Sequence, residues 1–278
     1  MRSTFSLYVG IDYSGAQTPT SRLKGLQVYA ARSGGPAEKV STPAAVRALG
    51  RMPGMPPGSL PRHWTRAEIA QWIIGVVKQG ERALIGIDHG FSFPDVYFRR
   101  YGLDTWHAFL ADFCRHWPST GEDTFIDHIR HRMPGFDTPD IEPRSGTPSE
   151  LRLCERWTSS AKSVFLFDVN GSVAKSTHAG IPWLARIRES CGSAVHVWPF
   201  DGWLPPEHKT VIAEVYPSIF RNRFPRGDRT GDAQDAYATA RWLAETGAAG
   251  HLPRYFDPPL TREQRDVAGR EGWILGIA

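Results

Sequence analysis

The stretch LYVGIDYSGAQ, residues 7–17, is an apolar run that ends in an aspartate, Asp12, and then breaks into a polar turn containing glycine. The pattern recurs in ALIGIDHGFSFP, residues 83–94, where the apolar run ends in Asp88. Short apolar runs that stop at Gly, Ser or Pro are typical of buried β-strands. Two strands that each end in Gly-Ile-Asp can bring two carboxylates close together.

The neighbouring segments indicate further strands and helices. Residues 5–12, 25–31 and 38–42 predict a three-stranded meander, which we expect to be antiparallel. A capping box formed by Thr65 and Glu68 opens a predicted helix that closes on Gly80 and leads into the second Gly-Ile-Asp strand. Later segments predict helices at about 104–117, 181–190 and 232–245, an apolar run at 163–169, strands at 194–200 and 211–220, and Pro/Gly-rich loops at 50–61 and 134–149.

This order of elements predicts an α/β protein with a mixed β-sheet flanked by helices. Neither a barrel nor a doubly wound Rossmann fold fits, because both alternate strand and helix throughout. The chain has 278 residues, of which 41% are hydrophobic and 22% charged, so it can bury a large core. We expect a single domain in which approximately residues 95–205 form an insertion of helices and loops between core strands.

Several classes of protein are excluded by composition. No apolar run approaches the roughly 20 residues of a membrane span, and the N-terminus lacks the layout of a signal peptide, so we expect a cytoplasmic protein with no membrane partner. The three cysteines are odd in number and far apart, which supports neither a disulfide framework nor a zinc site. A formal net charge of +4 gives only a mild attraction to phosphate backbones.

Acidic residues in unusual positions are the strongest functional signal. Asp12, Asp88 and Glu214 lie in or just after apolar strands, where an unpaired carboxylate costs several kcal/mol. Asp232 and Asp235 are spaced i, i+3 near the start of a predicted helix and therefore share one face. Such carboxylates can converge on Mg²⁺ or Mn²⁺ and support two-metal phosphodiester hydrolysis, which needs no nucleophilic side chain. The structural alternatives are a turn aspartate at Asp12, a solvated edge position at Glu214, and a helix cap at one of the last two.

The motifs VGIDYSG, IGIDHGFSFP, AEVYPS and GDAQDAYATARWLA together resemble the DUF429 family of uncharacterised proteins. That family is predicted to adopt the ribonuclease H-like fold and to belong to the wider group that includes RuvC-type resolvases. The likeness runs along most of the chain, from Val9 to the closing EGWILG, residues 271–276. It implies a ribonuclease H-like mixed sheet and a metal-dependent hydrolase of nucleic acid, with Mg²⁺ or Mn²⁺ as cofactor.

The resemblance also assigns roles to the acids. Asp12 corresponds to the first-strand aspartate that bridges both metals, Glu214 to a later-strand acid, and Asp232 or Asp235 to the acid of the C-terminal helix. Asp88 is a further acid at a strand end. In the family the second motif usually runs from Asp through a small residue to Pro, whereas here His89 and Gly90 intervene, which makes His89 a candidate ligand or proton shuttle.

Basic residues suggest how a nucleic acid would be held. The dense basic stretch before the last predicted helix supplies the candidates for backbone contact, namely Arg221, Arg223, Arg226 and Arg229. The segment that ends in Lys175 and Ser176 does not match the P-loop pattern, because Val169 and Ala174 stand where glycines are required. Lys175 and Ser176 can still contact a phosphate. Arg152 and Glu155 are spaced as an i, i+3 ion pair on a helix, worth about a few tenths of a kcal/mol.

The leading hypothesis is a metal-dependent nuclease that acts on DNA or RNA. Actin-like ATPases and sugar kinases, whose first strand also ends in Gly-Ile-Asp, share the broad superfold, so a nucleotide-dependent phosphotransferase is the first alternative. That alternative requires a second glycine-rich phosphate hairpin and an adenosine-binding segment, and the sequence shows no recognisable form of either. A non-catalytic protein that binds metal or nucleic acid is the second alternative.

Overall fold

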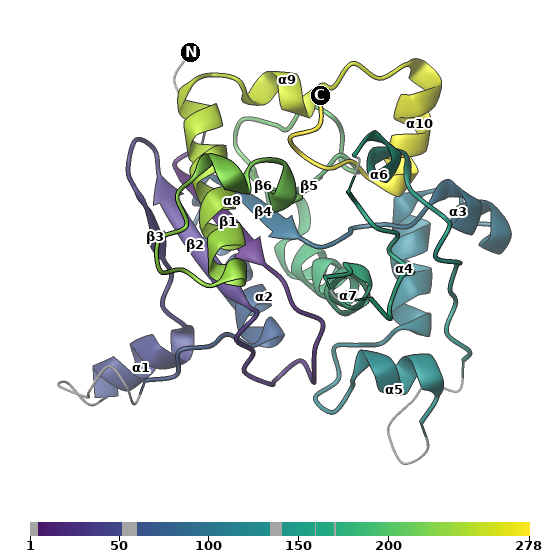
Figure 1. The fold of residues 1–278 in the computed structure, drawn as a ribbon, viewed down its shortest axis with the longest axis horizontal. Coiled ribbons are helices and arrows are strands. Elements are labelled where there is room, and N and C mark those ends of the chain that lie inside the picture. Colours follow the sequence, from purple (N-terminus) through teal and green to yellow (C-terminus); the bar gives the residue numbers. More distant parts are fainter. Residues whose placement is uncertain (1–4, 52–59, 134–140, 159, 170) are drawn as a thin grey trace.

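A single mixed sheet organises the protein (Figure 1), in a computed structural model that describes residues 5–51, 60–133, 141–158, 160–169 and 171–278. Its strand order is β3-β2-β1-β4-β6-β5. The strands are β1 (Leu7–Asp12), β2 (Gln27–Arg32), β3 (Ala37–Lys39), β4 (Ala83–Asp88), β5 (Val195–Trp198) and β6 (Thr210–Glu214). The first three form an antiparallel meander, and β4, β6 and β5 continue the sheet in parallel with β1. The predicted α/β class and the mixed sheet are confirmed.

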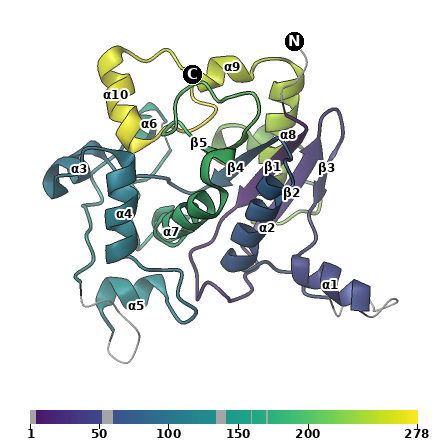
Figure 2. The same ribbon diagram turned by 180° about the vertical axis from the view of Figure 1, so that it is seen from behind.

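Helices cover both faces of this sheet. They are α1 (Pro43–Arg51), α2 (Arg66–Lys78), α3 (Asp95–Tyr101), α4 (Trp106–His116), α5 (Ile126–His131), α6 (Leu153–Trp157), α7 (Ala174–Cys191), α8 (Gly231–Ala248), α9 (Leu252–Phe256) and α10 (Arg262–Glu271). Helix α8 packs across β1 and β2 on one face, whereas α2 and α7 pack together on the other (Figures 1 and 2). The short 3-10 helices η2 (Gly192–Ala194), η3 (Pro217–Ile219) and η4 (Arg221–Arg223) connect larger elements.

The alternation of side chains along β1 divides the core into two layers. Val9 and Ile11 belong to the apolar cluster shared with α2 and α7, whereas Tyr8 belongs to the cluster shared with α8. Gly10 lies on the same face as Tyr8, and a Cβ atom there would lie only 2.1 Å from a backbone carbonyl oxygen of α8. Because the period of a strand is two, Asp12 also lies on the α8 face.

The second Gly-Ile-Asp motif repeats this arrangement one strand away. In the parallel pairing of β1 with β4, Gly10 is opposite Gly86 and Asp12 is opposite Asp88. A Cβ atom at Gly86 would lie 2.9 Å from the Thr239 side chain of α8. The two glycines therefore let α8 approach the sheet closely, and the two aspartates end their strands side by side beneath it.

The segment between β4 and β6 forms a helical unit beside the sheet and then returns to it. Helix α4 packs against α7, and α7 packs against α2 (Figure 2). The apolar run at 163–169 forms no strand, because Val164, Phe165 and Phe167 are instead buried in the core of this unit. The predicted strand at 194–200 is present as β5, an edge strand of the sheet that lies within the range given for the insertion. Helix α7 begins at Ala174, several residues before the predicted start.

The C-terminal segment ties this helical unit to the sheet. The Glu271 carboxylate accepts a hydrogen bond of 2.5 Å from the N–H of Asp95 and another from the N–H of Leu153. These N–H groups belong to the first residues of α3 and α6, so one carboxylate caps two helix N-termini. The N–H of Leu275 donates to the carbonyl oxygen of Glu214 at the end of β6, at 2.9 Å.

Smaller predictions have mixed outcomes. The capping box of α2 is present, since the N–H of Glu68 donates to Thr65 Oγ1 at 3.0 Å and the Thr65 N–H donates back to the Glu68 carboxylate. In the predicted loop at 50–61, residues 50 and 51 belong to α1 and residues 52–59 lie outside the described part; so do residues 134–140 of the second loop. Helices α1, α3, α5, α9 and α10 were not predicted. Among the described helices, none has the length and apolarity needed to cross a membrane.

Candidate functional site

Three carboxylates converge where β1 and β4 end beneath α8. Asp12 and Asp88 are the last residues of two paired strands, and Asp235 reaches them from the N-terminal part of α8. One carboxylate oxygen from each of the three lies within 4.8 Å of the others. The repeated Gly-Ile-Asp motif thus brings its two acids together, and the C-terminal helix adds a third.

Asp232 lines the same cavity, which has a volume of about 430 Å³. Helix α8 is capped by Thr230, whose side chain accepts a hydrogen bond from the N–H of Ala233 at 3.3 Å. Neither Asp232 nor Asp235 is the N-cap residue, so the capping alternative is wrong for both. Both acids line the cavity, and Asp232 also lies in the first turn of α8, where a negative charge is favourable.

Burial and mutual repulsion perturb the acidic cluster. Burial, with the charges of Asp88, Asp232 and Asp235, raises the pKa of Asp12 well above its ordinary value of 3.8. Burial and the charges of Asp235 and Glu214 raise the pKa of Asp88 to about 8, although Arg221 lowers it. Two unit charges 4 Å apart repel by about 4 kcal/mol at an effective dielectric of 20. The cluster therefore needs a proton or a cation in order to persist at neutral pH.

Arg221 supplies part of the compensating charge. Its guanidinium forms an ion pair with Asp235 at 3.1 Å. The pKa of Asp235 is raised above its ordinary value, because burial outweighs the opposing charge and hydrogen bond of Arg221. The guanidinium is 45% exposed, so solvent screens this pair and it neutralises the three acids only in part.

Glu214, in contrast, lies outside the group of three. It is the final residue of β6 and is buried, with its carboxylate accepting hydrogen bonds from Arg152 Nη2 at 2.5 Å and Arg152 Nη1 at 2.7 Å. The N–H of Phe91 donates to the same carboxylate at 3.0 Å. Because both oxygens are occupied, this geometry does not support the predicted role of Glu214 as a metal ligand.

The Arg152–Glu155 pair differs from its prediction as well. Both side chains are about 1% exposed, and Arg152 Nε donates to Glu155 at 2.8 Å while its two other nitrogens hold Glu214. The predicted i, i+3 ion pair is present, but it is buried and belongs to a network of three charged groups. Desolvation makes breaking such a network far more costly than breaking a surface pair.

His89 packs as part of the core. Its Nδ1 lies 2.8 Å from the carbonyl oxygen of Gly90, and its ring meets the Tyr13 ring edge-on at 4.7 Å between centroids. A Cβ atom at Gly180 of α7 would lie 2.4 Å from His89 Nε2. Burial lowers the pKa of His89 to about 4, which keeps the ring neutral. This ring borders the cavity but is not among the converging groups, so the ligand or shuttle role is not supported.

Of the predicted backbone-binding residues, only Arg221 lines the cavity among the described side chains. The Arg229 guanidinium lies 3.7 Å from the centroid of the Tyr237 ring, and Arg226 Nε donates to the carbonyl oxygen of Arg229 at 2.6 Å. Arg223 is exposed in η4. Lys175 Nζ forms an ion pair with Asp127 at 2.7 Å.

The sequence did not reveal the other polar residues of the cavity. They come from segments far apart in the chain: Ser160, Lys162, Ser172, Ser176, Tyr216 and Ser218. Serines in loops carry no periodic signal, and only Ser176 was considered for phosphate contact. Nothing in the sequence alone predicts that these residues line one cavity with the acids.

The turn that follows Asp12 is held by a buried arginine. Arg66, 1% exposed, donates to the carbonyl oxygens of Ser14 at 3.1 Å, Ala16 at 2.7 Å and Gln17 at 2.8 Å. A Cβ atom at Gly15 would lie 2.0 Å from a backbone carbonyl oxygen at the start of α7. The serine and glycine after Asp12 thus let the chain turn tightly between α2 and α7.

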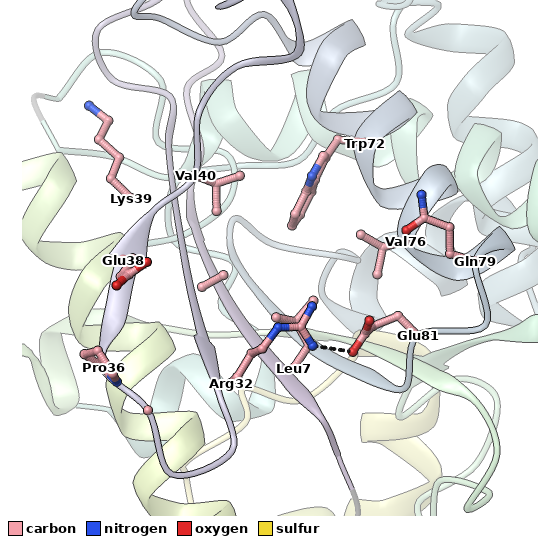
Figure 3. Close-up of a pocket in the computed structure, with 12 residues that line it drawn as sticks. Leu7, Arg32, Pro36, Glu38, Lys39, Val40, Trp72, Val76, Gln79 and Glu81 are labelled. Carbon is pink, nitrogen blue, oxygen red and sulfur yellow. Dashed lines mark hydrogen bonds and ion pairs between the residues drawn. The ribbon is translucent and has the colours of Figure 1, made fainter. Parts of the chain in front are cut away.

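A second cavity, of about 500 Å³, lies near the other end of β1, between β2, β3 and α2. Figure 3 shows Trp72 and Val76 of α2 on one side of it and Glu38 and Val40 on the other, with the amino group of Lys39 pointing away. Arg32 and Glu81, which both line this second cavity, are joined by a hydrogen bond of 3.0 Å. No cluster of acids or nucleophiles lines it among the described residues, so the candidate site is the cavity at Asp12.

In comparisons with known proteins, no family model, no curated protein and no solved structure matches this chain. The chemical argument therefore depends on the residues of the site itself.

The oxygen donors suit a hard divalent cation. Opposite ligands of one Mg²⁺ ion lie no farther apart than about 4.2 Å, close to the separation of the three carboxylates. Magnesium and manganese prefer carboxylate oxygens and retain positions for water and phosphate. The residues present fit such an ion, and its charge would offset both the burial and the repulsion that raise the pKa values of Asp12 and Asp88.

Proposed function

We propose that this protein is a metal-dependent nuclease with a ribonuclease H-like fold, which hydrolyses phosphodiester bonds of nucleic acid. The observation that carries the proposal is the convergence of Asp12, Asp88 and Asp235, with oxygens within 4.8 Å of one another, in a cavity open to a substrate. Carboxylates that are pressed together and hold raised pKa values are more common at functional sites than in structural positions.

The topology supports the fold part of the proposal. An antiparallel meander of three strands continues through parallel strands, the first strand ends in an acid, and a late helix across the sheet adds another. These features agree with the ribonuclease H-like arrangement that the resemblance to the DUF429 family implies. The resemblance also implies a strand acid at Glu214, and there the geometry favours Asp88 instead.

Each residue of the site has a distinct role in this proposal. Asp12, Asp88 and Asp235 would hold the cation, and Asp232 is placed to add a further oxygen from the same helix. Bound Mg²⁺ or Mn²⁺ supplies activation of a water molecule and stabilisation of the leaving oxygen. Arg221, beside Asp235, would hold a phosphate oxygen of the substrate, because guanidinium groups bind phosphate in a bidentate fashion.

Titration of Mn²⁺ by calorimetry in metal-free buffer tests the proposed site. We expect Asp12→Asn to lose binding, because it removes a charge from the centre of the cluster. Glu214→Gln is expected to retain binding, since that carboxylate is occupied by Arg152. Asp257→Asn is the matched control, because Asp257 is 56% exposed and pairs with Arg265 at 2.8 Å, away from the cavity.

Hydrolysis of labelled oligonucleotides then tests the activity. Wild type with Mn²⁺ is expected to cleave the strand, and Asp12→Asn to be inactive while its circular dichroism stays unchanged. Full activity of a folded Asp12→Asn protein, or Mn²⁺ binding that is lost in Glu214→Gln but kept in Asp12→Asn, would contradict the proposed arrangement.

A further inference from the structure

A segment rich in arginine lies next to the acids. It spans residues 221–229, includes η4, and carries four arginines and one aspartate before α8 begins. Its first residue, Arg221, lines the cavity and pairs with Asp235 at 3.1 Å. We call this segment the arginine loop. Because Arg221 belongs to the cavity, the rest of the arginine loop continues from the border of the site.

Most of the charge of the arginine loop is not neutralised by the protein. Among the described residues, no acid forms an ion pair with the guanidinium of Arg223, Arg226 or Arg229. Arg223 and Arg226 are exposed, and Arg226 Nε donates to the carbonyl oxygen of Arg229 at 2.6 Å, which leaves both terminal nitrogens of Arg226 without an acid. Unpaired guanidinium groups at the surface are available to an anionic partner, and they bind phosphate well.

A buried glutamine of α8 fixes the shape of the arginine loop. Gln234 is 5% exposed, and its Nε2 donates to the carbonyl oxygens of Phe224 at 2.8 Å and Arg221 at 3.3 Å. Its Oε1 accepts a hydrogen bond from Arg229 Nε at 2.8 Å. One side chain therefore holds both ends of the arginine loop, so its arginines are presented from a fixed backbone rather than from a free chain.

The arginine loop extends from the acids to the second strand of the sheet. Burial raises the pKa of Asp235, and the charges of Arg221 and Arg226 oppose that rise. Burial also raises the pKa of Tyr29 in β2, and there the charge of Arg229 opposes the rise. Figure 1 shows this segment beside the N-terminal end of α8, on the face of the sheet that α8 covers. The unpaired charges thus begin near the acids and continue outside the cavity.

We propose that the arginine loop binds the sugar-phosphate backbone of a nucleic-acid strand whose phosphodiester lies at the acids. This inference rests on the proposed function and names the surface that holds the substrate beside the site. A strand carries one negative charge at every phosphate, so a row of unpaired guanidinium groups matches it without reading bases. Binding is therefore independent of sequence and sensitive to salt.

The dependence of binding on salt tests the inference. Fluorescence anisotropy measures the affinity of the metal-free protein for a labelled thymidine strand of about 20 nucleotides at several salt concentrations. We expect the double change Arg223→Met with Arg226→Met to weaken binding at least about tenfold at low salt. It should also reduce the slope of log affinity against log salt by about 1.4, because each lost phosphate contact contributes about 0.7 on a single strand.

Two further double variants separate this surface from general charge and from loop shape. Arg115→Met with Arg262→Met changes the net charge equally at exposed positions of α4 and α10 outside the cavity, and should leave affinity and slope unchanged. Arg223→Lys with Arg226→Lys keeps the charge and should keep the slope. Circular dichroism checks that each variant is folded.

The outcomes that overturn the inference differ from those that overturn the proposed function. The inference is wrong if the methionine changes in the arginine loop leave affinity and slope unchanged, or if the control pair lowers them as much. It is also wrong if the lysine pair loses as much slope as the methionine pair, since charge would then not be the cause. In each of these cases the nuclease proposal stands as long as the wild type cuts the strand with Mn²⁺. If the wild type neither binds nor cuts the strand, the nuclease proposal itself fails.

Discussion

At the scale of single residues, Arg152 decides which acids remain free for a cation. It holds both oxygens of Glu214 and one oxygen of Glu155 while being about 1% exposed. Among the described residues no arginine forms such a pair with Asp12 or Asp88, and burial, together with the repulsion within their cluster, raises their pKa values. A carboxylate that a buried arginine satisfies is structural, whereas carboxylates that repel one another require a ligand.

Removing Arg152 should therefore affect stability more than metal binding. We expect Arg152→Met to lower the free energy of unfolding by about 3–5 kcal/mol, because two buried carboxylates lose their cation. Arg156→Met, at the exposed neighbour in the same helix, should change it by less than about 0.5 kcal/mol. Urea denaturation measures both, and equal, small effects of the two changes would show that the network contributes little.

Sequence reasoning identified most of the acids but not their partners. Asp12, Asp88 and Asp235 were recognisable because each interrupts an apolar strand or begins an amphipathic helix. Arg152, which binds Glu214, lies 62 positions away in the sequence. It precedes the short helix α6, and no local pattern indicates that this helix is buried. Chemistry that depends on such long-range pairs is fixed by tertiary packing, so the sequence could not separate Glu214 from the other acids.

At the scale of elements, the approach of α8 to the sheet positions Asp235 above the two strand acids. Gly10 and Gly86 make this approach possible, since a Cβ atom at either position would clash with α8. The three residues of the Gly-Ile-Asp motif therefore have different roles. Glycine admits the helix, isoleucine fills the opposite core, and aspartate reaches the site.

A glycine pair tests this packing. Gly10→Ala should destabilise the protein by about 1–3 kcal/mol or more and weaken Mn²⁺ binding, because the new Cβ atom would press on the α8 backbone. Gly75→Ala, in α2 with nothing within 4 Å of the added Cβ atom, should instead stabilise it by about 0.5–1 kcal/mol. Thermal unfolding and Mn²⁺ calorimetry measure these effects. A tolerated Gly10→Ala with unchanged metal affinity would contradict the role given to α8.

Most of the predicted elements are present, including the helix at about 104–117, which is α4, and the strand at 194–200, which is β5; the clearest error is the run at 163–169. The meander, α2, β4 and α8 follow strong apolar periodicity and clear caps, so local pattern and final structure agree. The run at 163–169 has a strand-like composition but is buried among the aromatic side chains of a helical unit. Such a run is ambiguous from periodicity alone, because burial on all sides removes the alternation that marks a strand.

At the scale of the whole molecule, the C-terminal segment ties the helical unit between β4 and β6 to the sheet. Glu271 caps α3 and α6 together, and Leu275 bonds to the end of β6. Figure 1 shows α10 lying over α6 and α3 at one side of the molecule. The sequence predicted an insertion but not this connection, because capping between distant segments cannot be read from local composition.

The acidic cluster should also make the stability of the whole protein depend on pH and metal. Because the folded-state pKa of Asp88 is raised from 3.8 to about 8, the folded protein binds more protons than the unfolded chain between these values. Its free energy of unfolding should therefore fall as pH rises through this window, by about 1–3 kcal/mol between about pH 5 and pH 8 in chelator.

Urea denaturation at both pH values, with and without Mn²⁺, measures this dependence. Asp88→Asn should flatten the decline in chelator, because it removes the group that must lose its proton inside the fold, whereas Asp257→Asn should not. Saturating Mn²⁺ should restore wild-type stability at the higher pH, by about 2.7 kcal/mol at one hundred times its Kd. Wild-type stability that rises with pH in chelator would mean that the carboxylates are already satisfied by the protein, and that the cluster has no need of a cation.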